Sequence, residues 1–353
     1  MVRPPHPVVG VVVAPTLLTL SAPWTVARRC LWLMLILSSG LAAGCGSPAG
    51  PGPVTVGPPQ ITCGSAISIE DAVGTEQAVS YALPSVAGGA APVTVACTPA
   101  SASLFKLGDT TVTCRATDTQ GREAACSFVV SVRHRPLGLT KYLAFGDSLT
   151  AGENGRPVNF ISFVDVANAY PTFLQEFFSA GIPSQQITVT NAGLSGEKVV
   201  DNDARLKDRI ARTQAQVLLL LEGINDLNGG SSPQSVANGL RDNIRTARER
   251  GVQYVFVSTL LPVASENCTS PVPRCRALDT PPGTIVATND RIRAMVTGTD
   301  ARLVDPYDLF NANRRTLIDL DGLHLRPEGN RALAGMFWDA IVRTVPAPQL
   351  RGF

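Results

Sequence analysis

Residues 141–153 read KYLAFGDSLTAGE, a short apolar run followed at once by a turn of small residues. The run over 141–145 has the length and composition of a buried strand. Gly146, Asp147 and Ser148 are residue types that end strands and begin helices. The stretch therefore predicts a strand that turns sharply into a helix. Ser148 at this turn is either an ordinary cap residue or a chemically active serine, and the rest of the chain must decide between them.

This strand is the first of five apolar runs that alternate with amphipathic stretches. The predicted strands are Lys141 to Phe145, Gln186 to Thr190, Val217 to Leu221, Val252 to Ser258 and Ala301 to Asp305. The predicted helices are Tyr170 to Ala180, Val200 to Thr213, Pro233 to Arg250, Gly283 to Thr297 and Pro327 to Thr344. Continuous apolar strands indicate burial on both faces, hence a parallel sheet. The order predicts a three-layer α/β/α domain over residues 141–345.

Polar blocks follow the predicted strands. GDSLTAG places Ser148 after the first strand, NAGLSGE places Gly196 after the second, and EGIND places Asn225 after the third. DGLHLRPEG places Asp321 and His324 before the last helix. Ligands bind beyond the carboxyl ends of the strands in such sheets, so the blocks are expected to converge.

Each block has an ordinary explanation when it is taken alone. Asn225 and Asp226, for example, could cap the helix that GGSSPQS introduces. His324 is harder to explain in this way, because the chain has three histidines and the other two, His6 and His134, lie in the leader and in a linker. The joint order of the blocks therefore favours a functional site.

The residue types fit nucleophilic catalysis. A serine hydroxyl needs a base with a pKa near 7, and His324 supplies one for Ser148. Asp321 would orient His324 and stabilise the imidazolium. The backbone N–H groups of Ser148 and Gly196 and the side-chain amide of Asn225 are candidate donors to an oxyanion.

Residues 142–343 resemble the SGNH (GDSL) hydrolase family, whose Ser, Gly, Asn and His blocks match at Ser148, Gly196, Asn225 and His324, with Asp321 completing the Asp-x-x-His pair. The resemblance implies a flavodoxin-like sheet, no metal or other cofactor, and hydrolysis of carboxylic esters or thioesters through an acyl-serine intermediate. The family also contains carbohydrate acetylesterases, lysophospholipases and acyltransferases. The alternatives are an acyltransferase that acts on a cell-envelope glycan and a non-catalytic surface-binding lipoprotein.

Composition and charge limit the class of protein. Of the 353 residues, 44% are hydrophobic and 6% aromatic, which is typical of globular cores. The formal net charge is +2, from 30 basic and 28 acidic residues, and there is no long basic run. A nucleic-acid partner is therefore not expected. The eight cysteines indicate an oxidising compartment.

The N-terminal segment has the features of an export signal. Arg28 and Arg29 precede a short apolar run over 31–37, and the small residues before Cys45 resemble a bacterial lipobox. We expect residues 1–45 to be a leader and lipoprotein-type signal, with Cys45 lipidated and the protein anchored to a membrane, facing the periplasm or the cell surface. The alternative is a plain secretory signal that is cleaved near Ala43. Residues 46–58 are rich in Pro and Gly and predict an extended tether.

Residues 59–133 show the period-two pattern of strands, as in TTVTCRATDTQGREAACSFVVSV. The segment contains Cys63, Cys97, Cys114 and Cys126, and four cysteines allow three pairings. The compact stretch between Cys97 and Cys114 favours a bond between these two, which leaves Cys63 to pair with Cys126. A domain of this size has a thin core, so each bridge would contribute about 2–4 kcal/mol.

Through ITCGSAISIE and AACSFVVSV this segment resembles a hyalin repeat (HYR) module. The resemblance implies an immunoglobulin-like β-sandwich that serves adhesion or spacing, with no particular ligand indicated. Residues 134–140 are expected to link it to the α/β domain.

A Pro-rich insertion, LPVASENCTSPVPRCRALDTPP, follows the fourth predicted strand. Cys268 and Cys275 could close it by a disulfide. A metal site is less favoured, because no nearby histidine or second cysteine pair would complete one. We expect the insertion to form one wall of the substrate pocket; residues 159–171 are either a second wall or core. The substrate class is an ester of a small molecule, a lipid or an acylated carbohydrate, and the acyl chain length stays open.

Overall fold

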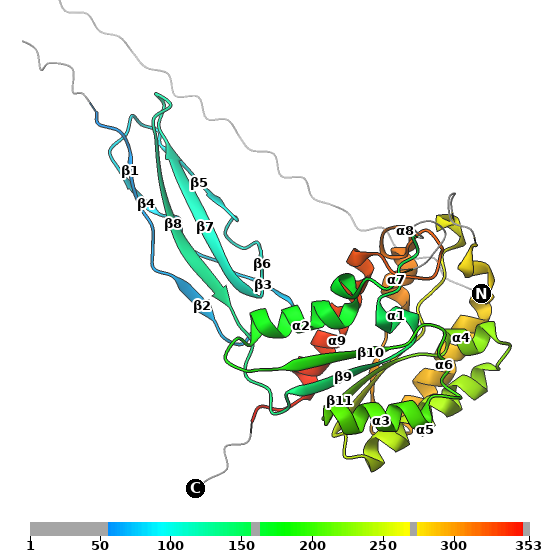
Figure 1. The fold of residues 1–353 in the computed structure, drawn as a ribbon. Coiled ribbons are helices and arrows are strands. Elements are labelled where there is room, and N and C mark those ends of the chain that lie inside the picture. Colours follow the sequence, from blue (N-terminus) through cyan, green and yellow to red (C-terminus); the bar gives the residue numbers. More distant parts are fainter. Residues whose placement is uncertain (1–55, 157–162, 269–273, 349–353) are drawn as a thin grey trace, which may run out of the picture. The chain divides into compact units, whose positions relative to one another are not determined.

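The computed structural model describes residues 56–156, 163–268 and 274–348. The predicted signal, Cys45 and most of the predicted tether lie outside the described residues, as do 157–162 and 269–273. None of the helices in the described ranges has the length and apolar character needed to cross a membrane. A β-rich domain and an α/β domain follow one another along the chain (Figure 1), and each is considered by itself.

The α/β domain is built on one parallel sheet with the strand order β10-β9-β11-β12-β13. Its strands are β9 (Lys141–Gly146), β10 (Thr188–Gly193), β11 (Val217–Leu221), β12 (Tyr254–Ser258) and β13 (Arg302–Val304). In chain order this is 2-1-3-4-5, the order of flavodoxin-like sheets. The predicted fold class is confirmed.

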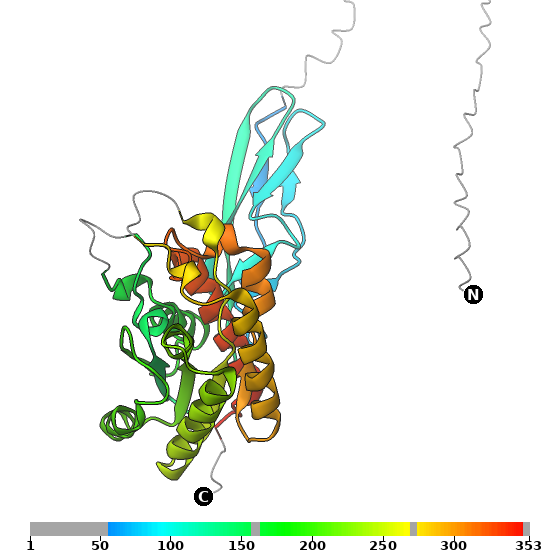
Figure 2. The same cartoon turned by 90° about the vertical axis from the view of Figure 1, so that its right-hand side faces the viewer.

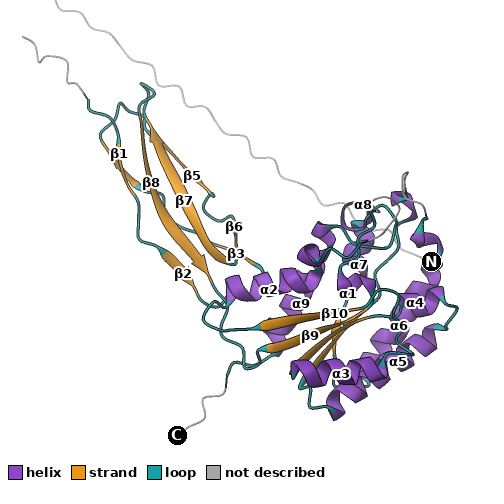
Figure 3. Ribbon diagram, in the orientation of Figure 1, coloured by secondary structure: helices purple, strands orange, loops and turns teal. Residues whose placement is uncertain are grey.

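Successive residues of the central strands point to opposite faces of the sheet. Because the residues on both faces are apolar, both faces are covered by helices. Tyr142 and Ala144 of β9 belong to one core cluster, whereas Leu143 and Phe145 belong to the other. The first cluster packs under α2 (Tyr170–Gly181) and α9 (Pro327–Thr344). The second packs under α3 (Asp203–Thr213), α5 (Pro233–Glu249) and α6 (Pro282–Thr297). Figure 3 shows the strands between these two helical layers, and Figure 2 shows α5 beside α6.

Most predicted elements lie within one residue of the expected bounds. Helix α3 begins at Asp203 and not at Val200, β12 begins at Tyr254 and not at Val252, and the second strand differs at both ends. The predicted span was Gln186 to Thr190, but β10 runs over Thr188–Gly193. The ladder with β9 continues through Asn191 and Ala192 and pairs Gly193 with Gly146. Backbone pairing with β9 thus extends the strand into Asn191 and Gly193, residue types that are more common in turns. Gly196 lies three residues after the end of the strand.

Residues 134–140, predicted to be a linker, pack onto the α/β domain. Leu137 is fully buried and Leu139 is 7% exposed. The Gln185 side chain accepts from the N–H of Leu137 at 2.7 Å and donates to its carbonyl at 2.7 Å. This segment therefore contributes to the core.

The β-rich domain has a four-stranded sheet, in the order β2-β8-β7-β5, and two short two-stranded sheets, β1-β4 and β3-β6. Its strands are β1 (Gln60–Thr62), β2 (Ile67–Ile69), β3 (Glu76–Ala78), β4 (Ser85–Ala87), β5 (Thr94–Thr98), β6 (Leu104–Lys106), β7 (Gly108–Thr117) and β8 (Glu123–Val132). The alternation predicted for the long hairpin is present: Val112 and Ala116 are fully buried on one face of β7. Asp118 closes the turn by accepting from the N–H groups of Gln120 and Arg122.

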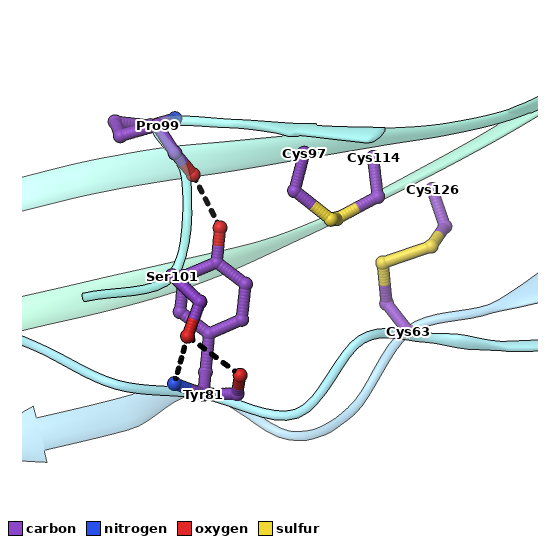
Figure 4. Close-up of a disulfide and its surroundings, with 7 residues drawn as sticks. All are labelled: Cys63, Tyr81, Cys97, Pro99, Ser101, Cys114 and Cys126. Carbon is purple, nitrogen blue, oxygen red and sulfur yellow. Dashed lines mark hydrogen bonds between the residues drawn. A yellow bond between two sulfur atoms is a disulfide. The ribbon is translucent and has the colours of Figure 1, made fainter. Parts of the chain in front are cut away.

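Two disulfides cross this domain (Figure 4). They join Cys63 to Cys126 and Cys97 to Cys114, the pairing that the sequence favours. Beside them the hydroxyl of Tyr81 donates to the carbonyl of Pro99. The buried cluster of this domain is small, so the two bonds carry a large share of its stability.

Candidate active site

Ser148 lies where β9 turns into α1 (Ser148–Ala151), at the carboxyl edge of the sheet. The turn is tight because glycines flank it. A Cβ at Gly146 would lie 1.9 Å from the carbonyl oxygen of Leu221, and one at Gly193 would lie 2.1 Å from the amide nitrogen of Ala151. Neither position accepts a side chain, which lets the end of β9 lie close to the end of β11 and lets α1 lie directly against the end of β10.

The helix cap is supplied by Asp147, not by Ser148. The Asp147 side chain accepts from the N–H of Leu149 at 2.9 Å. Ser148 is the first helical residue, and the structure records no acceptor for its N–H among the described residues. The hydroxyl of Ser148 is therefore not used in capping and can serve another partner.

That partner is His324. The distance between Ser148 Oγ and His324 Nε2 is 2.9 Å, and the distance between His324 Nδ1 and Asp321 Oδ2 is 2.6 Å. All three residues are buried: His324 is fully inaccessible, Asp321 is 4% exposed and Ser148 is 5% exposed. The structure thus aligns the three predicted side chains in one hydrogen-bonded row.

The turn that carries Asp321 and His324 holds itself together locally. The second carboxyl oxygen of Asp321 accepts the N–H groups of Leu323 and His324, each at 3.0 Å. Burial disfavours the charged carboxylate, but the hydrogen bond and charge of His324 and these two N–H groups outweigh it, so the pKa of Asp321 is lowered. An ionised Asp321 requires the proton on Nδ1, which leaves Nε2 free to accept from Ser148.

The candidate oxyanion donors lie on adjoining segments. Gly196 has φ +81° and open space beside it, so no side chain hinders approach to its N–H. Asn225, in α4 (Ile224–Asn228), donates through Nδ2 to the carbonyl of Glu197 at 3.0 Å. The N–H of Leu194 donates to the carbonyl of Gly146 at 2.9 Å. These two bonds connect the Ser148, Gly196 and Asn225 blocks.

The capping alternative for Asn225 and Asp226 does not hold in the structure. Ser232 caps α5, since its side chain accepts from the N–H of Ser235. Asp226 is fully buried and accepts from the N–H of Val199 at 2.9 Å. Both residues therefore support the edge of the sheet.

Several charged residues near the candidate site were not predicted from the sequence. Asp147, Glu222 and Asp226 are fully buried. Glu153 is close to the row, with Oε2 3.9 Å from His324 Nε2 and Oε1 3.9 Å from a guanidinium nitrogen of Arg276. The one sequence signal for these four acidic residues is their position within or beside the GDSLTAG and EGIND motifs: Asp147, Glu153, Glu222 and Asp226.

Asp147 provides a prediction about stability. Burial raises its pKa to about 7, the N–H of Leu149 and His324 oppose this rise, and the carboxyls of Asp226 and Glu197 add to it. The folded protein thus keeps a proton that the unfolded chain, with a pKa of 3.8, releases. Between pH 4 and 7 this group makes the folded state less stable as pH rises, and above pH 7 its cost is constant.

Asp147→Asn keeps an oxygen for the Leu149 N–H and removes the titration. We expect the free energy of unfolding of the variant, relative to wild type, to rise by about 2–4 kcal/mol between pH 4 and pH 7 and to level off above it. Urea unfolding at several pH values measures this difference. Asp201→Asn, at an exposed position, is the control. A difference that does not vary with pH would contradict the prediction.

The insertion after β12 braces the Asp321 turn. Cys268 and Cys275 form a disulfide, and the Cys268 sulfur lies 3.5 Å from the carbonyl oxygen of Asp321. The N–H of Arg276 donates to the same oxygen at 2.8 Å, and the N–H of Ala264 donates to the carbonyl of Gly322 at 2.8 Å. Residues 269–273, part of the predicted pocket wall, lie outside the described residues.

Because the disulfide contacts the Asp321 turn, its removal should affect catalysis. Changing both Cys268 and Cys275 to Ser is expected to lower the free energy of unfolding by about 2.5 kcal/mol and kcat/KM for an aryl ester about tenfold. The control is the double change of Cys97 and Cys114 to Ser in the β-rich domain, which should leave kcat/KM unchanged. An unaltered kcat/KM after loss of the Cys268–Cys275 bond would show that the brace is dispensable.

Of residues 159–171, the second candidate wall, 159–162 lie outside the described residues, and the described part divides in two. Ala169 and Tyr170 are fully buried and belong to the core. Val164 and Val166 are 46% and 55% exposed. With Ala151 and Leu194 they line a hollow of about 340 Å³ at the rim that carries α1 and the end of β10.

A serine, an imidazole and a carboxylate in a hydrogen-bonded row at the carboxyl edge of a parallel sheet are the arrangement of a serine hydrolase. The family model of the GDSL-like lipase/acylhydrolase family matches residues 144–332, and that of the HYR domain matches residues 54–132. The chain belongs to the GDSL-like lipase/acylhydrolase family: it is a GDSL-type ester hydrolase preceded by an HYR domain.

Several solved structures are similar to part of this chain. A lipase/acylhydrolase from Enterococcus faecalis is 18% identical, with 60% of this chain and 100% of that chain covered and a TM-score of 0.47. A member of the lipolytic protein G-D-S-L family from Veillonella parvula is 17% identical (58% and 99% covered, TM-score 0.44). An acetylxylan esterase from Geobacillus stearothermophilus is 21% identical (58% and 95% covered, TM-score 0.46). No curated protein matches the chain.

Proposed function

We propose that the protein hydrolyses carboxylic esters, with an acyl or acetyl group, through an acyl enzyme on Ser148. The observation that carries the proposal is the position of His324, whose two ring nitrogens lie within hydrogen-bond distance of Ser148 Oγ and of Asp321. As Ser148 Oγ bonds to the ester carbonyl carbon, its proton passes to His324 Nε2. The carbon–oxygen bond to the alcohol then breaks, and the alcohol leaves with that proton.

The second half-reaction uses the same groups. Water gives a proton to His324 and attacks the acyl carbon, and the serine leaves with that proton as the carboxylic acid is released. Asp321 stays ionised and stabilises the imidazolium in both steps. The lowered pKa of Asp321 supports this role, because the carboxylate is kept charged despite its burial.

The oxyanion of each tetrahedral intermediate would be held by three donors: the N–H of Ser148, the N–H of Gly196 and Asn225 Nδ2. Two observations support this assignment: the N–H of Ser148 has no recorded acceptor in the part of the chain that the structure describes, and the approach to Gly196 is open. Nδ2 of Asn225 has two hydrogens, and one of them is used by the carbonyl of Glu197. The other hydrogen is the one available to substrate.

We further propose that the protein is exported and anchored to a membrane by a lipid on Cys45, with the HYR domain acting as a spacer or an adhesion module. The disulfides support export, since such bonds persist outside the reducing cytoplasm. Metabolic labelling with a fatty-acid analogue, followed by fractionation, tests the anchor. Cys45→Ala should abolish the label and release the protein from the membrane fraction.

The ester specificity is tested with aryl esters of graded acyl length and with acetylated sugars. The hollow lined by Val164, Val166 and Leu194 also includes Ala151 of α1, the helix that begins at Ser148. Activity that persists with longer acyl chains would indicate lipid-like substrates. A sharp fall beyond acetyl would indicate carbohydrate deacetylation. Product analysis with an added sugar acceptor separates hydrolysis from acyl transfer. Absence of hydrolysis throughout the panel would overturn the proposal.

A further inference from the structure

One guanidinium group outside the catalytic row is bonded to several parts of the candidate oxyanion site. Arg205, in the first turn of α3, has a side chain that is only 18% exposed. Its Nε and Nη2 donate to the two carboxyl oxygens of Glu197, and its Nη1 donates to the carbonyl of Ala192 at 2.6 Å. Nη2 also lies 3.4 Å from the carbonyl oxygen of Gly146. The guanidinium carbon lies 3.9 Å from the centre of the Phe145 ring.

These partners are next to the proposed oxyanion donors. Gly146 is two residues before Ser148, whose N–H is the first donor. Glu197 follows Gly196, whose N–H is the second donor. The carbonyl of Glu197 also accepts from Asn225 Nδ2, which carries the third. Arg205 thus contacts the end of β9, the end of β10 and the loop after β10, all three of which must keep their spacing for the donors to converge.

We propose that Arg205 is the positioning residue of the oxyanion hole. This inference rests on the proposed function, because it assumes that Ser148, Gly196 and Asn225 are the donors. A guanidinium is suited to the task, since its planar fork offers five N–H donors in fixed directions and also stacks on an aromatic ring. A lysine ammonium has the same charge but cannot maintain several divergent bonds at these angles.

The charges around Arg205 explain why an apolar side chain would not suffice. The Glu197 side chain is only 8% exposed, and the fully buried carboxyl of Glu222 lies nearby, as does that of Asp147. Burial, then the carboxyls of Asp147 and Glu197, raise the pKa of Glu222, whereas Arg205 lowers it. Without the guanidinium, Glu197 would be a buried charge beside other acidic groups, and it would have to move toward water. Its movement would carry Gly196 with it.

The effect should appear in the transition state and not in substrate binding. The oxyanion exists only after attack on the carbonyl, so donors that lose their alignment weaken the tetrahedral state and not the bound ester. We expect Arg205→Met to lower kcat about 100- to 1000-fold and Arg205→Lys about 10- to 100-fold, with KM changed less than threefold. A boronic acid that forms a tetrahedral adduct on Ser148 should lose affinity by a similar factor.

Arg209→Met is the matched control, because Arg209 is one turn later on α3 and exposed; it should retain wild-type kcat and inhibitor affinity. Thermal unfolding and circular dichroism establish that each variant is folded. Glu197→Gln provides a second measurement, since it keeps the side-chain shape and weakens the same contact. Its effect combined with Arg205→Lys should be much less than the product of the two single effects.

The outcomes separate this inference from the function on which it rests. If wild type hydrolyses no ester and binds no boronic acid, the proposed function fails. If wild type is active but folded Arg205→Lys and Glu197→Gln keep kcat and inhibitor affinity within twofold, the role of Arg205 is overturned. A loss that appears in KM alone, or in thermal stability alone, would also overturn it. If Arg205→Met does not fold, kcat and inhibitor affinity of Arg205→Lys and Glu197→Gln still test the role of Arg205.

Discussion

Ser148→Ala is expected to lower kcat/KM for an aryl acetate about 10⁴-fold or more, the largest effect of any substitution in the chain. The methyl group of alanine cannot attack a carbonyl, and no other hydroxyl contacts His324 Nε2 among the described residues. Folding should change little, because the helix cap is made by Asp147 and not by the serine. The measurement is steady-state hydrolysis together with thermal unfolding.

Covalent labelling gives an independent reading of the same substitution. A fluorophosphonate probe should modify wild type at Ser148 and leave Ser148→Ala unmodified, and peptide mass mapping identifies the labelled residue. Ser184→Ala is the control, because Ser184 is exposed and lies outside the polar blocks; it should be labelled at the wild-type rate. Labelling at another serine, or retained hydrolysis by Ser148→Ala, would refute the proposed nucleophile. A wild type that is neither labelled nor hydrolytic would favour the non-catalytic surface-binding lipoprotein.

Asp321→Asn is expected to lower kcat about 10³- to 10⁴-fold, the second largest effect. The asparagine oxygen can still accept the N–H groups of Leu323 and His324, which keeps the turn intact. Its amide nitrogen, however, would face Nδ1 of His324 as a donor. The ring must then carry its proton on Nε2, where it cannot accept the proton of Ser148.

Asp319→Asn is the control for this change. Asp319 is in the same turn and is 2% exposed, but its carboxylate pairs with Arg156 at 2.8 Å and not with the imidazole. We expect a loss of stability in this variant with kcat within about threefold of wild type. Equal losses of kcat for Asp319→Asn and Asp321→Asn would show that the turn matters only for folding and would contradict the orienting role of Asp321.

Much of the fold could be predicted because its signals are local. Helix α9 begins and ends at the predicted residues, and β11 spans the predicted Val217–Leu221. An uninterrupted apolar run of five residues is an unambiguous strand in this context, and a Pro at the first turn marks the start of a helix. The second strand was misplaced because its last residues, Asn191 and Gly193, are held in the ladder by pairing with β9, which no local pattern shows.

Arg205 shows why part of the candidate site could not be predicted. It lies in DARLKDRIART, where most charged residues of the amphipathic α3 face water and only Leu206 and Ile210 are buried. The helical pattern of the sequence does not distinguish Arg205 from the other charged residues of this segment. The bonds of Arg205 to Ala192 and Gly146 arise because α3 packs against the ends of β10 and β9. These partners lie 13 and 59 residues before Arg205 in the chain.

The order of the layers and the placement of the four polar blocks at one edge of the sheet follow from periodicity and connection rules alone. Which of these polar groups form hydrogen bonds with one another depends on how distant segments pack. Ser148 and His324 are 176 positions apart in the chain, and a hydrogen bond forms only when its atoms come within about 3 Å. Whether Ser148 capped its own helix or faced an imidazole therefore depended on how the sheet and the last loop pack together.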